Sequence, residues 1–144
     1  PYSLGFVRGY NLRSFDPQEC GSVNLQQGEC PAIDQLVGTR KAKASVEVRV
    51  PLLGPERLAL IPFRYVPTEL VLFSDAGLAW TGDEGPSLTW TTDPDPGQRV
   101  PVVSAGVATR HNVLGALVLE LYYARPFQRP EAGGQFGLRF LPGW

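Results

Sequence analysis

The clearest pattern in the chain is a strict alternation of polar and apolar residues over 41–50. The segment reads Lys-Ala-Lys-Ala-Ser-Val-Glu-Val-Arg-Val, so small or aliphatic side chains occupy one face and mainly charged side chains the other. A period of two predicts a β-strand, and Pro51 is expected to end it. The strand could belong to a soluble β-sandwich with its charges in water. It could equally place its apolar face in lipid and its charges inside a barrel.

Four later segments show the same kind of pattern, at residues 69–80, 102–111, 116–125 and 135–141. The segment 69–80 is mostly apolar but contains Asp75, and a buried carboxylate is costly unless it is paired. In 116–125 the alternation places Glu120 and Tyr122 on the inward face. Strands of about 7 to 12 residues are long enough to cross a membrane at a tilt. We therefore predict an all-β chain with five antiparallel strands in meander order.

The connections between these segments differ in length. Residues 11–38 are polar and show no sustained period, which predicts a long loop with a short helical turn at 34–37. Residues 51–68 contain four prolines and predict an irregular connection. Short and long connections alternate in outer-membrane barrels, although 51–68 is longer than a short turn.

Composition narrows the possible functions. The net charge of −1 gives no basic surface for nucleic acid, and no apolar run approaches the ~18 residues of a membrane helix. With one His and no Cys-x-x-Cys pattern, no metal or cofactor site is expected. No nucleophile–base pair or phosphate loop points to an enzyme. The chain begins at Pro1 and contains no Met, which suggests a processed or partial chain.

The two cysteines, Cys20 and Cys30, both lie in the long polar loop. In an oxidising compartment they are expected to form a disulfide, with two free thiols as the alternative.

Several short motifs occur in an order that resembles a known family. Val7-Arg8-Gly9-Tyr10 resembles a Val/Ile-Arg-Gly-Phe/Tyr loop signature, residues 45–51 resemble Ser-x-Glu-x-Arg-x-Pro, and residues 73–77 resemble Phe-x-Asp-x-Gly. Residues 104–107 and 119–127 resemble the two strands that follow. The chain thus resembles the C-terminal barrel region of the bacterial surface antigen superfamily, the BamA/TamA-type outer-membrane proteins.

The closing strand resembles the aromatic-ended C-terminal signal of that family. The matching residues are Phe136, Leu138, Phe140 and Trp144, whereas Pro142 and Gly143 depart from the signal.

The resemblance implies that these are the last five strands of a sixteen-stranded transmembrane barrel, with residues 1–40 as a long loop and 41–144 as the strands. It also implies a docking cluster inside the lumen, formed by Arg8, Gly9, Glu47 and Asp75. The planar guanidinium of Arg8 can bridge two carboxylates, and Gly9 allows the loop to turn beside them. The alternative is that Arg8 is an ordinary solvated loop residue.

The function that the resemblance implies is non-enzymatic assembly, insertion or translocation of other proteins in the bacterial outer membrane. The expected partners are missing N-terminal barrel strands or another protein chain, the lipid bilayer, and client outer-membrane proteins. Two alternatives remain: a barrel fragment that serves as a membrane anchor or structural subunit, and a soluble β-sandwich binding module.

Overall fold

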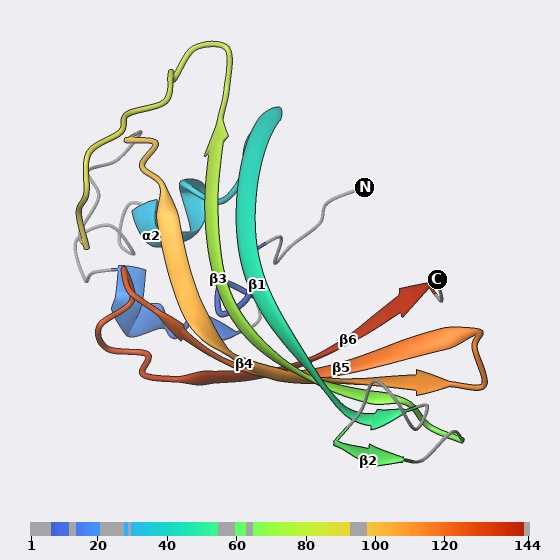
Figure 1. The fold of residues 1–144 in the computed structure, drawn as a ribbon. Helices are drawn as coiled ribbons and strands as arrows, with labels where there is room; N and C mark the ends of the chain where they lie inside the picture. The colour runs from blue at the N-terminus through green and yellow to red at the C-terminus, as the bar shows by residue number, and fades with distance from the viewer. Residues whose placement is uncertain are drawn as a thin grey trace.

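The computed structural model describes residues 7–11, 14–20, 28, 30–54, 60–62, 65–92 and 98–142. In this part of the chain the strands form one curved sheet with the order β2-β1-β3-β4-β5-β6 (Figure 1). The strands are β1 (Arg40–Gly54), β2 (Ile61–Pro62), β3 (Thr68–Trp80), β4 (Val102–Val113), β5 (Leu117–Pro126) and β6 (Gln135–Pro142). Two short helices, η2 (Pro17–Cys20) and α2 (Pro31–Asp34), precede the sheet.

The five long strands pair with their sequence neighbours in antiparallel register. The predicted all-β meander is therefore confirmed, and four of its five strands lie within two residues of their expected bounds. The alternation of polar and apolar residues predicts strands correctly, because successive side chains of a strand point to opposite faces of the sheet.

The remaining strand, β1, differs from the prediction because it continues past Pro51 to Gly54. An edge strand tolerates proline, since one side of its backbone lacks a partner strand, and the pairing with β3 shifts between Pro51 and Leu53. The end of β1 then pairs in parallel with the two-residue β2. The expected irregular connection at 51–68 thus contains strand, while its residues 55–59 and 63–64 lie outside the described residues.

The predicted helical turn was also displaced. The helix α2 spans Pro31–Asp34, three residues before the expected position. Proline suits the first turn of a helix because it needs no N–H partner there, so Pro31 sets the start. The turn continues to Val37, whose N–H donates to the Asp34 carbonyl oxygen over 3.1 Å.

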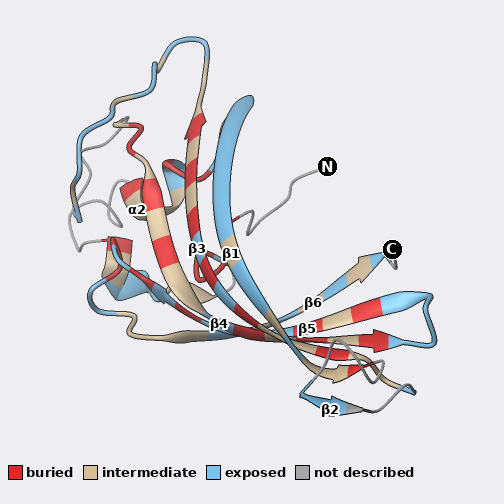
Figure 2. Ribbon diagram, viewed as in Figure 1, coloured by how far each residue is buried: buried red, intermediate tan, exposed pale blue. Residues whose placement is uncertain are grey.

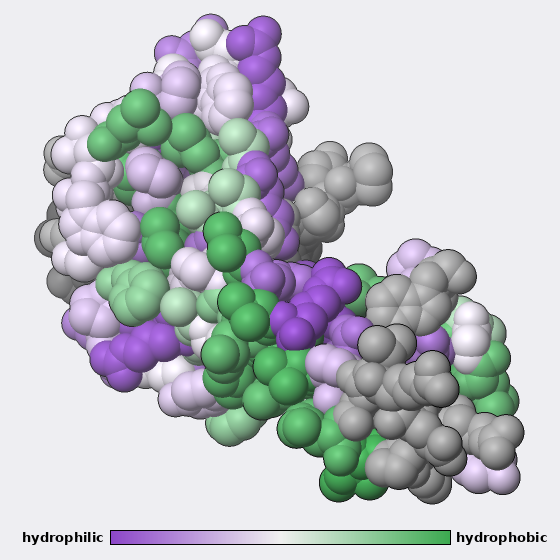
Figure 3. Space-filling model, in the orientation of Figure 1, coloured by the Kyte–Doolittle hydropathy of each residue, from purple (hydrophilic) through white to green (hydrophobic). Residues whose placement is uncertain are grey.

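The two faces of the sheet have opposite chemistry. One outward row crosses all five long strands and consists of exposed apolar side chains, in the order Val48, Leu72, Val107, Tyr123 and Phe136. Hydrophobic side chains gather over the curved middle of the sheet in Figure 3. The opposite, inner face carries the buried positions, which appear as red bands on β3, β4 and β5 in Figure 2.

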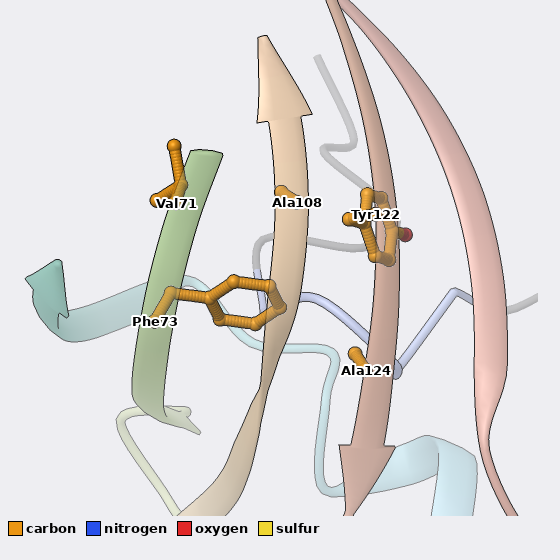
Figure 4. Close-up of a cluster of buried hydrophobic side chains, with 5 residues drawn as sticks. All are labelled: Val71, Phe73, Ala108, Tyr122 and Ala124. Atoms are coloured by element: carbon orange, nitrogen blue, oxygen red, sulfur yellow. The ribbon is translucent and has the colours of Figure 1, made fainter. Parts of the chain in front are cut away.

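The inner face holds a small apolar cluster of Val71, Phe73, Ala108, Tyr122 and Ala124 (Figure 4). The rings of Phe73 and Tyr122 meet edge to face, with centroids 6.4 Å apart. A second cluster joins the loop to the sheet through Val7, Tyr10, Leu36 and Val102. Within the described residues, no helix has the length and apolar character needed to cross a bilayer.

Candidate functional site: an arginine cluster on the inner face

The segment Val7–Tyr10 folds back onto the inner face of the sheet. The Tyr10 N–H donates to the Val7 carbonyl oxygen over 3.1 Å, which closes a tight turn. Gly9 has a φ of +90°, and a Cβ there would lie 3.3 Å from the Cβ of Ala124. A side chain at position 9 would therefore be both strained and crowded. This turn aims Arg8 at the sheet.

Arg8 is buried and binds carboxylates from three strands. Its Nε and Nη2 atoms donate to the two carboxylate oxygens of Asp75 on β3, over 2.7 and 2.8 Å. Nη2 also donates to Glu47 on β1 over 2.9 Å, and Nη1 lies 3.5 Å from Glu120 on β5. A guanidinium presents its donors in a fixed plane, which suits this divergent set of acceptors.

The surroundings hold the guanidinium in its charged form. It stacks over the Phe73 ring, with its central carbon 3.5 Å from the ring centroid, and a cation over an aromatic face is attracted to the ring. Burial alone would lower the pKa of Arg8, but the hydrogen bonds and charges of Asp75, Glu120 and Glu47 outweigh it and raise that pKa. The Ser45 hydroxyl donates a further hydrogen bond to Asp75.

Two other arginines share the carboxylates. Arg110 on β4 bridges Glu47 and Glu120, at 2.7 and 2.6 Å, and Arg139 on β6 binds Glu120 at 2.6 Å. The cluster therefore ties the loop to β1, β3 and β5 and links these strands to β4 and β6. Each described carboxylate in it has at least two basic partners, which offsets the cost of taking the charges out of water.

The structure brings together all four residues named from the sequence, Arg8, Gly9, Glu47 and Asp75. Sequence reasoning missed Glu120, Arg110 and Arg139 as members of the site. Alternation placed Glu120 on the inner face, but only the register shows that Arg110 and Arg139 lie opposite it on the neighbouring strands. The residues Phe136, Leu138 and Phe140 are exposed on the outer face, and Trp144 lies outside the described residues.

Cys20 and Cys30 form a disulfide in the loop. A closed loop of this size is expected to contribute about 3 kcal/mol to stability by restricting the unfolded chain. In non-reducing denaturing buffer we expect no reaction with a thiol-labelling reagent, and two labels per chain after reduction. Labelling before reduction would contradict the bond, and a Cys20→Ser variant provides the one-thiol control.

Glu19, next to the disulfide, is paired with Arg129 in the connection between β5 and β6, at 2.7 Å. Burial would raise the pKa of Glu19, but its hydrogen bonds with Arg129 and with the Asp16 N–H outweigh it and lower that pKa. Because the folded pKa is lowered, the pair stabilises the loop fully above the usual glutamate pKa of about 4.3. This contribution is lost as the pH falls through the folded value.

We therefore expect protease cleavage near residues 14–20 to rise on acidification from pH 6 to pH 3, measured with an acid-active protease. Asp16 and Glu131 line the same depression as Glu19, so the acid response needs a control that is specific to Glu19. The matched control is Glu19→Gln, which should be cleaved faster at pH 6 and should show a smaller further rise. An equal acid response in both proteins would show that Glu19 is not the responsible group.

Among the described residues, no set of three or more His, Cys, Asp or Glu side chains is arranged to hold a metal ion. The arrangement instead binds one protein segment to a sheet through charge pairs. Strands with an apolar outer face and a charged inner face, which receives a loop, define a portion of a transmembrane β-barrel.

Comparison with known families agrees with this class. The chain matches the Omp85 superfamily domain over residues 3–143, and it belongs to that superfamily. Members of the superfamily are bacterial outer-membrane proteins that take part in protein insertion or transport. Searches of curated proteins and of solved structures gave no significant match.

Proposed function

We propose that this chain is the C-terminal part of a bacterial outer-membrane β-barrel that assembles, inserts or translocates other proteins without covalent chemistry. The observation that carries the proposal is the docking of Arg8 onto Asp75, Glu47 and Glu120 on the inner face. Together with the Omp85 match, it supports a barrel whose lumen holds its own loop. In this proposal residues 1–40 are the loop and 41–144 the strands.

The open edges of the sheet support a larger barrel. In the described part of the chain, residues 40–50 of β1 have only β3 beside them, and β6 has only β5. Unpaired backbone groups at a sheet edge are not tolerated in lipid, and membrane barrels need about eight strands or more. The partners of β1 and β6 in this proposal are further barrel strands, as in the sixteen-stranded barrel that the family resemblance implies, or strands of another protein.

The inner face also argues against a β-sandwich. A sandwich buries its inner face against a second sheet. Here the loop residues Val7, Arg8 and Tyr10 are buried against it. The outer face exposes a continuous apolar row, which suits lipid better than water.

The test uses the full-length protein in liposomes. An unfolded outer-membrane β-barrel protein is added as client, and its folding is followed by the change in gel mobility of unheated samples. For translocation, a secreted passenger is scored by protection from external protease. We expect either folding or protection to exceed that in empty liposomes. If neither folding nor protection exceeds the level in empty liposomes, the proposal is contradicted. That result would favour a barrel that only anchors or supports a larger assembly.

A further inference from the structure

A second buried arginine, Arg129, lies in the connection between β5 and β6 and points toward the loop. Each of its five N–H groups has an acceptor on that loop. The donations are Nε to Glu19 (2.7 Å), Nη2 to Glu19 (2.8 Å) and to the Ser14 carbonyl oxygen (2.9 Å), and Nη1 to the Ser14 hydroxyl (3.0 Å) and to the Gly9 carbonyl oxygen (2.7 Å). The guanidinium also stacks on Phe15, 3.8 Å from its ring centroid. A planar cation with every donor used is specific for one arrangement of its acceptors.

The preceding residue, Gln128, is also buried and binds the other side of the same turn. The Tyr10 hydroxyl donates to the Gln128 side-chain oxygen over 2.7 Å and accepts from the Gln128 N–H over 3.1 Å. Burial raises the pKa of Tyr10 to about 12, so the phenol keeps its proton. Gln128 is itself held to the start of β4, through the Pro101 carbonyl oxygen and the Val103 N–H.

The position of these contacts along the loop is informative. Gly9 follows Arg8 directly, so the carbonyl group bound by Arg129 is one residue from the side chain that enters the carboxylate cluster. Arg8 points from the loop into the sheet, whereas Arg129 points from the β5–β6 connection into the loop. The backbone of Arg8 and Gly9 is therefore held from two sides, by the carboxylate cluster and by Arg129.

We propose that Gln128 and Arg129 form an intramolecular binding site for the Arg-Gly-Tyr turn, and that Arg129 is a positioning residue that holds Arg8 over its carboxylates. The ligand is the chain's own loop, recognised through two backbone carbonyl groups, a phenol and a carboxylate. A charge-assisted hydrogen bond to a backbone carbonyl group holds a turn more firmly than a neutral one. The proposal goes beyond the proposed function, because it concerns how the loop is held and not what the barrel acts on.

The test reads the position of Arg8 directly. A 4-fluorophenylalanine at position 73 lies under the Arg8 guanidinium, so its fluorine NMR resonance reports whether the cation is present. In the full-length protein, Arg8→Ala gives the resonance of the undocked state. We expect Arg129→Ala to raise the undocked population roughly 10- to 100-fold, as the loss of charged hydrogen bonds implies. An undocked population in Arg129→Ala that equals the wild-type undocked population would overturn the proposal.

Three variants separate positioning from a general loss of structure. Glu19→Gln should speed protease cleavage near residues 14–20 but raise the undocked population less than Arg129→Ala does, because the contact of Arg129 to the Gly9 carbonyl oxygen remains. Arg129→Lys should give an intermediate population, since an ammonium group cannot reach all the acceptors. Arg125→Ala, an exposed arginine four residues earlier, should change neither signal. If Arg129→Ala does not fold, Arg129→Gln takes its place, and an undocked population equal to that of the wild type overturns the proposal equally. No client protein is needed, so failure here is distinct from failure of the proposed function.

Discussion

Replacing Arg8 with alanine is expected to release the loop and to lower the stability of the barrel. Protease cleavage within residues 11–38 should increase in liposomes, and the folded gel form should convert at lower temperature. The physical reason is the loss of a buried cation that binds three carboxylates. Removing one partner of a buried charge pair typically costs about 3–5 kcal/mol, because the remaining charge is left uncompensated.

The cost should be concentrated at Asp75. Glu47 and Glu120 keep Arg110 as a partner when Arg8 is lost. Among the described groups, Asp75 keeps the Ser45 hydroxyl and Lys43, whose nitrogen is 3.8 Å away. The backbone N–H of residue 8, which donates to Asp75 over 3.3 Å, remains a partner for as long as the loop stays docked. The double variant Arg8→Ala/Asp75→Asn removes the stranded charge as well. We expect it to regain part of the stability, a non-additive result typical of directly interacting residues.

Two further variants complete this test. Arg8→Lys should be intermediate, because an ammonium group cannot hold both Asp75 oxygens and Glu47 in one plane. Arg125→Ala should behave as wild type, since that side chain is exposed on β5. If Arg8→Ala leaves the cleavage rate, the gel mobility and the activity unchanged, Arg8 is a solvated loop residue and the docking role is wrong.

The strands could be predicted from the sequence because each alternates between two different environments. This holds even for β3, where Asp75 shares a face with Phe73 and Val71. The end of β1 was missed because proline is a poor guide at a sheet edge. Its missing N–H removes no ladder bond where no strand lies alongside, so β1 continues beyond Pro51.

Some residues of the site could likewise be predicted from the sequence, and others could not. Glu47 and Asp75 were found because a family motif marks each of them. Glu120 was placed on the correct face, but its partners Arg110 and Arg139 were not identified. Strand register decides which side chains meet, and register depends on pairing that no single strand encodes. Arg129 and Gln128 gave no signal at all. They lie in a polar connection without a period, and only tertiary contacts distinguish them from solvated residues.

Placing an arginine on the outer face is expected to distinguish a membrane barrel from a soluble sheet. Leu121 lies in the middle of β5, is 48% exposed, and pairs with Thr109 and Leu138 on the neighbouring strands. If this face meets lipid, Leu121→Arg should lower the free energy of unfolding by about 2–4 kcal/mol, the cost of a cation near the bilayer midplane. If the face meets water, the change should stay within about 0.5 kcal/mol, as for most surface substitutions.

The matched control is the same substitution at Leu114. This residue lies in the turn between β4 and β5, is 89% exposed, and belongs to neither strand. Leu114 has a φ of 54°. Leucine and arginine both carry a Cβ, so the substitution does not change the backbone strain at this position. Urea unfolding of the full-length protein in liposomes, followed by the gel mobility of unheated samples, should separate the two variants. Equal unfolding midpoints and slopes for Leu121→Arg and Leu114→Arg would mean that lipid does not contact the outer face of β5, and the barrel assignment of this strand would fail.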